Sequence, residues 1–489
     1  MRQRIQHIIP WAILLLLIAL QLPFLEADPD LSLSGSRGAF TDEGLYSAQI
    51  RNLIQQGDLT LNEAPSTLIT PLFSLFLYLI FSILGIELWI GRLAVLVISL
   101  GLIRWASRSR NYPATFSPFL LLLAGSSYVL FSYSHFCLAE ILGATCIFAA
   151  IGLEAANFNR KTILFTLGSH SLLFAAFLLK LQFLYILPLL PMMIFLQFFL
   201  VDKTQRIAVA KQLLISVSIL SLLTLVYYIC WYLPNKALFM NIMSDATAGR
   251  FAKIGDLPRH LNFIFKALFW NDYQWLNTFC FLVLLPLGLW QLFHKKTPDL
   301  YKYLLLGAFC WLLLESHKLA LNYYPTRYFV SFYLAIIVSN ALILSRLWQL
   351  AYKWNWNQVL IGLLLFGVLI KNGIDYQKGL QSRAYTLKAV NGYLANYDFD
   401  KQVIMGPWAP SVSWKNKAIT HPIWNNYFND KAVFETFRPY IIVSEVDEED
   451  SNQAFSSKGI NLDAQADSIR YFRVGRWDLK LIWVKTPKD

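Results

Sequence analysis

Long uncharged apolar runs recur along this chain from residue 8 to residue 372. Crossing the hydrocarbon core of a bilayer takes about 20 apolar helical residues, and many of the runs approach that length. The chain is 56% hydrophobic and only 15% charged, which excludes a water-soluble globular protein. We therefore expect a mainly α, polytopic membrane helix bundle with about 11–13 spans. The expected spans cover residues 8–25, 67–85, 88–104, 114–131, 136–153, 163–179, 182–201, 212–233, 275–293, 302–316, 326–346 and 356–372.

Basic residues indicate the topology of these spans. The net charge of +12 is spread over short clusters between apolar runs, which is typical of cytoplasmic loops rather than of a nucleic-acid surface. This orientation places the C-terminal part outside the cell. One crossing too many or too few remains between residues 26 and 104, so we expect residues 57–87 to be partly juxtamembrane or re-entrant, unless one boundary differs. Because no Asn-x-Ser/Thr acceptor occurs, a bacterial inner membrane is favoured over a eukaryotic lumen.

The pattern divides the chain into a membrane domain, 1–374, and a soluble periplasmic domain, 375–489. The membrane domain carries a first external loop at 26–66 with juxtamembrane helices and a second external loop at 234–274. The soluble part begins with a predicted helix near residues 376–396. Short apolar runs then predict strands and a small α/β unit. These runs cover residues 402–405, 440–443, 470–474 and 479–484.

Asp42 and Glu43 are the first candidate catalytic residues. They open a helix whose apolar residues recur at helical spacing, so the helix can lie along the membrane surface. A carboxylate there can act as a general base toward a hydroxyl group, with partial desolvation raising its pKa. The alternative is that Thr41 or Asp42 caps the helix N-terminus.

Two further candidates interrupt apolar helices, where an ionisable group costs about 2.5–3.5 kcal/mol. His135 and Glu140 stand at the start of an apolar helix, and the alternative is an interfacial pair that anchors the helix end. Lys180 lies between two apolar runs. It either snorkels to the surface or binds an anion in a cavity.

A dense polar and aromatic cluster spans residues 315–328 and contains His317, Lys318, Tyr324 and Arg327. An aromatic belt with basic anchors explains part of this cluster. It explains Arg327 less well, because the positive-inside bias disfavours an arginine at the outer end of a new helix. Arg92, near Glu87, is more typical of a helix-end anchor.

The order of these motifs resembles the polyprenyl-phosphate-sugar-dependent membrane glycosyltransferases that include lipid A aminoarabinose transferases and protein O-mannosyltransferases. The sequence DEGLYSAQIRNLIQQGDL at 42–59 is similar to the family pattern DEARYAEIAREMLESGDW. Four later segments resemble family motifs in the same order, and together the five cover roughly the first 340 residues. They are FSILGIELWIGRLAVLVISL at 81–100, HFCLAEILGATCIF at 135–148, LLKLQFLYILPLLP at 178–191 and YPTRYFVSFYLAII at 324–337.

The resemblance implies a GT-C fold and an inverting transfer from a polyprenyl-phosphate sugar to a cell-envelope acceptor, which is a glycan, lipid A or a protein. It makes Asp42 the base, with Glu43 beside it, and Glu140 the second acidic position. Lys180 and Arg327 are the main candidates for the donor phosphate, with Lys318 and His317 near them. His135 and Tyr324 are substrate-contact candidates.

Departures from the family pattern point to a divergent subfamily. A Lys-Pro-Pro motif is replaced by Ile69-Thr70-Pro71, His135 stands where arginine is common, and Leu181-Gln182 replaces Gly-Pro. The metal requirement stays open, because two acidic positions are compatible with Mg²⁺ or Mn²⁺ but do not establish a site. The alternatives to an enzyme are a lipid-linked glycan flippase and a non-catalytic assembly scaffold; polar residues at one rim and the absence of a visible repeat disfavour a transporter.

Overall fold

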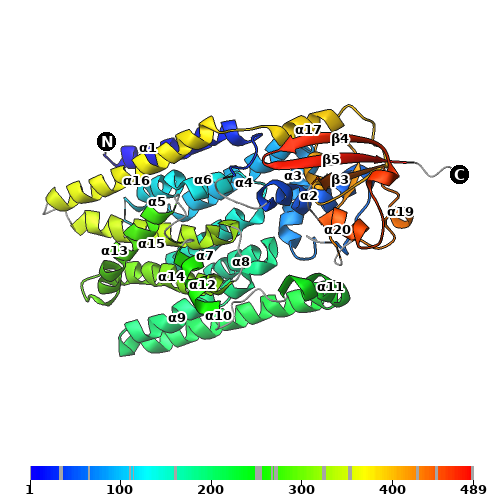
Figure 1. Ribbon diagram of the computed structural model, residues 1–489. Helices are drawn as coiled ribbons and strands as arrows, with labels where there is room; N and C mark the ends of the chain where they lie inside the picture. Colours follow the sequence, from blue (N-terminus) through cyan, green and yellow to red (C-terminus); the bar gives the residue numbers. More distant parts are fainter. Residues whose placement is uncertain are drawn as a thin grey trace.

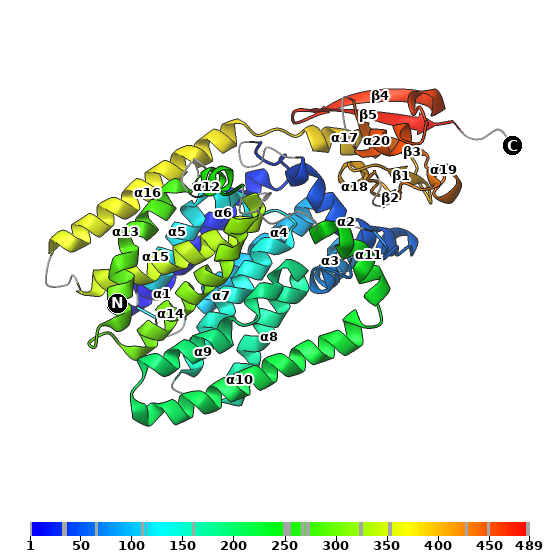
Figure 2. The ribbon, with the colours of Figure 1, turned by 60° about the horizontal axis from the view of Figure 1, so that its bottom comes forward.

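The computed structural model describes residues 2–31, 37–63, 67–108, 112–113, 115–158, 162–247, 256–265, 268, 274–321, 326–350, 355–425, 429–446 and 450–485. Within these ranges the chain is mainly helical and carries a small mixed sheet near its C-terminus (Figure 1). The helices form one body, and the sheet with its short helices lies at one end of that body (Figure 2). This confirms the fold class predicted from the sequence.

Every predicted apolar segment coincides with helical structure. The helices of the body are α1 (Arg2–Gln21), α2 (Gly38–Gln56), α3 (Pro71–Leu84), α4 (Leu88–Ala106), α5 (Phe116–Ser126), α6 (Tyr128–Ser134), α7 (Ala139–Asn157), α8 (Ile163–Leu179), α9 (Leu189–Leu200), α10 (Arg206–Tyr227), α11 (Lys236–Thr247), α12 (Leu257–Phe265), α13 (Trp275–Phe293), α14 (Asp299–Glu315), α15 (Val330–Leu350) and α16 (Asn355–Gln381). Three 3₁₀ segments matter for the site: η2 (Leu181–Ile186), η7 (Ser316–Ala320) and η8 (Thr326–Phe329).

The number of candidate spans is smaller than the 11–13 expected. Among the described residues, seven helices are long and apolar enough to cross a membrane, or eight if α5 and α6, bent by 82°, form one span. The difference arises because several apolar runs form shorter helices. Helix α3 has 14 residues and is about 21 Å long, against a hydrocarbon core of about 30 Å. This is the segment where the sequence left one crossing in doubt.

Helices α7 and α15 form the centre of the bundle. In their apolar windows 89% and 94% of the residues are buried, whereas only 6% are buried in the window that contains α10. Helix α10 accordingly runs along the outer edge of the body (Figure 2). Chemistry-bearing residues on α7 or at the start of α15 are therefore shielded from lipid by neighbouring helices.

The C-terminal domain follows α16, which continues past residue 375 to Gln381. Its five-stranded sheet has the order β2-β1-β3-β5-β4, with parallel pairing of β1 to β2 and β3 and antiparallel pairing of β5 to β3 and β4. The predicted runs correspond to β1 (Val403–Met405), β3 (Ile441–Glu445), β4 (Ala466–Val474) and β5 (Trp477–Val484), while β2 (Ile419–His421) was not predicted. The short helices are α17 (Thr386–Leu394), α18 (Ala409–Val412), α19 (Val433–Thr436) and α20 (Asp450–Ser456).

The central strand β3 is buried on both faces. Ile441 and Val443 join one apolar cluster and Ile442 joins the other, because alternate side chains of a strand point to opposite faces. The first cluster also contains Ala39 and Phe40 of α2. Part of the core of the C-terminal domain therefore comes from the helix that carries the acidic motif.

Helix α2 is enclosed between the bundle and the C-terminal domain (Figures 1 and 2), with 13 of its 19 residues buried. It does not lie on an open membrane surface, because protein covers both of its sides. The helix begins at Gly38, so Thr41 and Asp42 lie inside it and do not cap it. It ends at Gly57, whose φ of 73° is a left-handed conformation that glycine adopts without strain.

One face of α2 packs against α18 and the segment that follows α18. Gly44 allows close approach, because a Cβ there would lie 2.3 Å from the Ser411 hydroxyl oxygen. Arg51 donates hydrogen bonds to the carbonyl oxygens of Pro410 at 2.5 Å and Ser413 at 3.3 Å. Residues 40, 44, 47 and 51 share this face at helical spacing, whereas Asp42 and Tyr46 lie on a different face.

Candidate active site

Asp42 and Arg327 form a buried ion pair. Asp42 extends from α2, and its Oδ2 pairs with a guanidinium nitrogen of Arg327 on η8, 285 residues later in the chain. The two side chains are 11% and 10% exposed. Asp42, which opens the first family-like motif, and Arg327, which lies in the last one, are thus in contact.

Glu140 and Lys180 complete the cluster. Glu140 lies in the first turn of α7, and its Oε1 accepts a hydrogen bond from Lys180 Nζ at 2.5 Å. The same oxygen lies 3.4 Å from Arg327 Nε. The sequence left open whether Lys180 snorkels to the surface; the structure instead buries its side chain to 7% exposure beside a carboxylate. We call Asp42, Glu140, Lys180 and Arg327 the four-charge cluster.

Aromatic rings surround this cluster. Lys180 Nζ lies 4.7 Å from the ring centre of Tyr46 and 5.3 Å from that of Tyr328, and Arg327 packs 5.2 Å from Tyr328. A side-chain hydrogen bond joins Tyr133 of α6 to Thr326, the residue before Arg327. Tyr133 was not predicted, since a tyrosine in an apolar helix has no local sequence pattern that indicates its function. These rings keep the charges in a low-dielectric setting, where electrostatic interactions are stronger.

The four-charge cluster is formally neutral and not fully satisfied. Burial raises the pKa of the Asp42 carboxyl, and the charges of Arg327 and Lys180 oppose that rise without cancelling it. Glu140 Oε2 is buried and has no hydrogen-bond partner among the described residues. Because buried polar atoms are normally paired, this oxygen can accept a hydrogen bond from a hydroxyl group of a bound molecule.

Glu43 makes a separate structural pair with Arg92. Its two carboxylate oxygens accept hydrogen bonds from Arg92 Nε at 2.9 Å and Nη2 at 2.5 Å, and Oε1 also accepts the Cys137 amide at 2.7 Å. Arg92 Nη1 donates to three carbonyl oxygens of residues 24–27. The sequence suggested that Arg92, near Glu87, anchors a helix end; in the structure its ionic partner is Glu43. The side chain next to the proposed base thus fastens α2 to α4.

Lys318 lies in a second buried cluster, next to the first. Its Nζ contacts Glu315 Oε2 at 2.7 Å and donates to the carbonyl oxygen of Tyr328 at 2.7 Å. His317 is exposed, with Nδ1 at 2.6 Å from the Leu314 carbonyl oxygen and its ring against Tyr185. Tyr324 lies outside the described residues.

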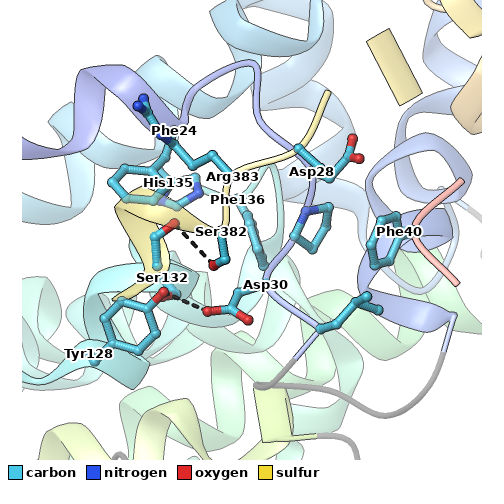
Figure 3. Close-up of a pocket in the computed structure, with 15 residues that line it drawn as sticks. Phe24, Asp28, Asp30, Phe40, Tyr128, Ser132, His135, Phe136, Ser382 and Arg383 are labelled. Atoms are coloured by element: carbon cyan, nitrogen blue, oxygen red, sulfur yellow. Dashed lines mark hydrogen bonds between the residues drawn. The ribbon is translucent and has the colours of Figure 1, made fainter. Parts of the chain in front are cut away.

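His135 is not part of the four-charge cluster. Its Nδ1 lies 2.6 Å from Gln21 Oε1, and its ring stacks on Phe24. It lines a cavity of about 150 Å³ between α6, the loop after α1 and the segment after α16 (Figure 3). In that cavity Tyr128 donates a hydrogen bond to Asp30 at 2.7 Å. His135 and Glu140, neighbours in the sequence, therefore face different sites and do not form an anchoring pair.

The donor set of the four-charge cluster does not suit a divalent cation. Within the described ranges no group of three or more His, Cys, Asp or Glu side chains could hold a metal ion. Asp42 and Glu140 also contact Arg327 and Lys180, which supply the positive charge that a metal would otherwise supply. Mg²⁺ and Mn²⁺ need several free oxygen ligands, which the four-charge cluster does not offer.

Comparison with known proteins shows the fold. No protein-family model matches the chain, and no curated protein matches it in sequence. Among solved structures, ArnT from Cupriavidus metallidurans in the apo state has a TM-score of 0.63 at 13% identity, covering 96% of this chain and 97% of that one. ArnT bound to undecaprenyl phosphate gives 0.59 at 14% identity with the same coverages. An oligosaccharyltransferase from Archaeoglobus fulgidus, in complex with zinc and sulfate, gives 0.53 at 13% identity over 88% of this chain and 68% of that one. The chain therefore has a GT-C-like fold along nearly its whole length, as the sequence resemblance implied.

Proposed function

We propose that this multi-pass membrane protein is an inverting glycosyltransferase that moves a sugar from a polyprenyl-phosphate carrier to a hydroxyl of a cell-envelope acceptor. One observation carries the proposal: the four-charge cluster joins four distant segments in a buried place. A carboxylate beside two cations suits a reaction in which a proton is removed and an anion leaves. The ArnT structure with undecaprenyl phosphate supports the carrier class.

In the proposed reaction, the acceptor hydroxyl oxygen attacks the anomeric carbon of the donor sugar from the face opposite the phosphate. The bond from that carbon to the phosphate oxygen breaks, and its electron pair leaves with the polyprenyl phosphate. Asp42 takes the hydroxyl proton as the new glycosidic bond forms. Its raised pKa suits this role, because a base with a pKa nearer the working pH holds the proton better.

Lys180 and Arg327 are the proposed ligands of the leaving phosphate. In the absence of donor they are balanced by the two carboxylates, and an incoming phosphate competes for the same cations. Positive charge placed where the leaving group gains negative charge lowers the barrier, so no strong general acid is needed. Glu140 keeps the two cations together through Oε1 and offers Oε2 to a hydroxyl of the sugar or acceptor.

Glu43 acts in this proposal through the position of α2 rather than by touching substrate. His317 and Tyr324 are further candidate contacts for the donor or acceptor, and His135 is one through its separate cavity. Lys318 contacts Glu315 and the Tyr328 carbonyl oxygen instead. The proposed setting is the inner membrane of a bacterium, with the C-terminal domain in the periplasm. The acceptor is a glycan, lipid A or a protein.

The test is release of polyprenyl phosphate by protein in nanodiscs, with radiolabelled lipid-linked sugars as donors and a cell-envelope extract as acceptor. Wild-type protein should release it and label an acceptor with at least one donor sugar. Asp42→Asn should bind donor and lose transfer by about 10²–10⁴-fold, the contribution typical of a general base.

The outcomes separate the alternatives. Full turnover by Asp42→Asn would refute the base assignment. Saturable donor binding without release by the wild type would favour a flippase or a scaffold over an enzyme.

A further inference from the structure

Glu315, at the C-terminal end of α14, is a fully buried carboxylate whose Oε1 accepts three side-chain hydrogen bonds. Its Oε1 accepts hydrogen bonds from the hydroxyl groups of Tyr185 at 2.7 Å and Ser331 at 2.5 Å and from Trp311 Nε1 at 3.3 Å. Its Oε2 lies 2.7 Å from Lys318 Nζ. Oε2 makes this ion pair without a hydrogen bond. Because Glu315 is 0% exposed, it is shielded from substrate and can act only through the groups that contact it.

The contacts of Glu315 also reach the segment that carries Arg327. Lys318 Nζ bridges Glu315 and the carbonyl oxygen of Tyr328, the residue after Arg327. Ser331 lies four residues after Arg327, in the first turn of α15. Glu315 therefore holds the first turn of α15, which directly follows η8, through Ser331, and it holds the Tyr328 carbonyl oxygen of η8 indirectly through Lys318.

The same carboxylate also holds the segment that follows Lys180. Tyr185 belongs to η2, and the amide of Phe183 in that segment donates to the Lys180 carbonyl oxygen at 2.9 Å. Lys318 adds to this grip, since its Nζ packs 5.6 Å from the ring of Phe183 and 5.1 Å from that of Tyr185. Lys180 and Arg327 thus both lie next to segments that Glu315 contacts, directly or through Lys318.

We infer that Glu315, with Lys318, is a positioning pair that sets the separation of Lys180 and Arg327 and so the shape of the proposed phosphate site. A buried ion pair is a poor source of stability compared with apolar packing, whereas holding one geometry is a better attested use of such a pair. The role of the pair in phosphate binding rests on the proposed function; its role in fixing the two segments does not.

Glu154 provides a matched control. It is also 0% exposed, and it accepts hydrogen bonds from Ser169 at 2.7 Å and Gln212 at 2.8 Å, which connect α7, α8 and α10. The test variant is Glu315→Gln with Lys318→Met, which removes both charges together so that neither is left buried alone. The control variant is Glu154→Gln.

The first measurement uses no ligand. Spin labels at Leu184→Cys on η2 and Ala320→Cys on η7, both introduced in a Cys230→Ser background, report the separation of η2 from η7, the segment that carries Lys318, by double electron–electron resonance. Leu184 and Ala320 are exposed, and Cys230 is the exposed cysteine among the five free ones. The distance distribution should broaden or shift in the Glu315/Lys318 variant and stay as in the wild type for Glu154→Gln.

The second measurement is binding of a short-chain polyprenyl phosphate to the protein in nanodiscs. The Kd should rise about tenfold in the Glu315/Lys318 variant, because the two cations would no longer be held at the separation that one phosphate group needs. Glu154→Gln should bind as the wild type does. An unchanged Kd, with a loss of thermal stability no different from that of Glu154→Gln, would reduce the pair to a structural role.

The two measurements distinguish failure of the proposed function from failure of the positioning role. If the wild type binds no polyprenyl phosphate, the proposed function fails, and the spin-label distances alone decide the positioning role. An unchanged distance distribution would overturn the inference whether or not the protein transfers sugar.

Discussion

Replacing Glu43 by glutamine tests whether this carboxylate holds α2 in place or takes part in transfer. The side chains of Arg92 and Glu43 are 0% and 3% exposed and share two hydrogen bonds. Removing one charge of a buried pair leaves the other uncompensated and costs about 3–5 kcal/mol. At roughly 2 °C per kcal/mol, the slope for large domains, the midpoint of thermal unfolding should fall by about 6–10 °C.

The assay is scanning calorimetry in nanodiscs, with transfer measured on the same samples well below the midpoint. Arg92→Lys is the companion variant, since it keeps the charge and loses the fork that reaches Glu43 and the carbonyl oxygens of residues 24–27. A double-mutant cycle should return a coupling of about 0.5–3 kcal/mol. A Glu43→Gln protein that melts like the wild type but transfers no sugar would refute this reasoning and return Glu43 to the catalytic step.

Three further outcomes are expected. Lys180→Ala and Arg327→Ala should each lower kcat/KM for the donor by about 10²–10³-fold through lost charge stabilisation, measured from initial rates; unchanged values for both would refute the phosphate assignment. Transfer should decline as pH falls, with a midpoint above the ordinary aspartate value of 3.8, because burial raises the pKa of Asp42 and only its ionised form accepts a proton; a flat pH–rate profile down to pH 4 would contradict this. Gly44→Ala should destabilise the protein by about 1–3 kcal/mol, because the new Cβ would meet a hydroxyl oxygen of the C-terminal domain at 2.3 Å, whereas Gly392→Ala, with nothing within 4 Å, should not; calorimetry of both variants decides.

The helical body was largely predictable because each apolar run reports on its own surroundings. Residues 139–157, for example, form an uninterrupted helix where the sequence placed a span. The number of full crossings was not predictable in the same way. Hydropathy measures how long a run is apolar, whereas α3 shows that the helix inside such a run can be much shorter than the bilayer core.

The partners of the buried charges were the part that sequence could not supply. Arg92 stands five residues from Glu87 but pairs with Glu43, which is 49 residues away. Lys180 was equally consistent with a surface anchor and a buried ligand until its contact with Glu140 was known. Charge pairing depends on which helices become neighbours, and no local pattern records that information.

In the sheet, too, local strand patterns were predictable from the sequence and long-range partners were not. Strands β3, β4 and β5 were predicted because they are continuous apolar or alternating runs. Strand β2 has three residues, and its pairing with β1 depends on a parallel register that no turn signal announces. The contribution of Phe40 to the core of this domain was likewise hidden, since it comes from a segment more than 340 residues earlier.

The C-terminal domain contacts α2 near both ends of that helix. Near its start Arg37 pairs with Glu445, and near its end Gln56 donates to the carbonyl oxygen of Lys417. A molecule that binds this domain and shifts it would therefore pull on the backbone that carries Asp42. An antibody fragment raised against the C-terminal domain could in this way change the position of a carboxylate that it does not contact.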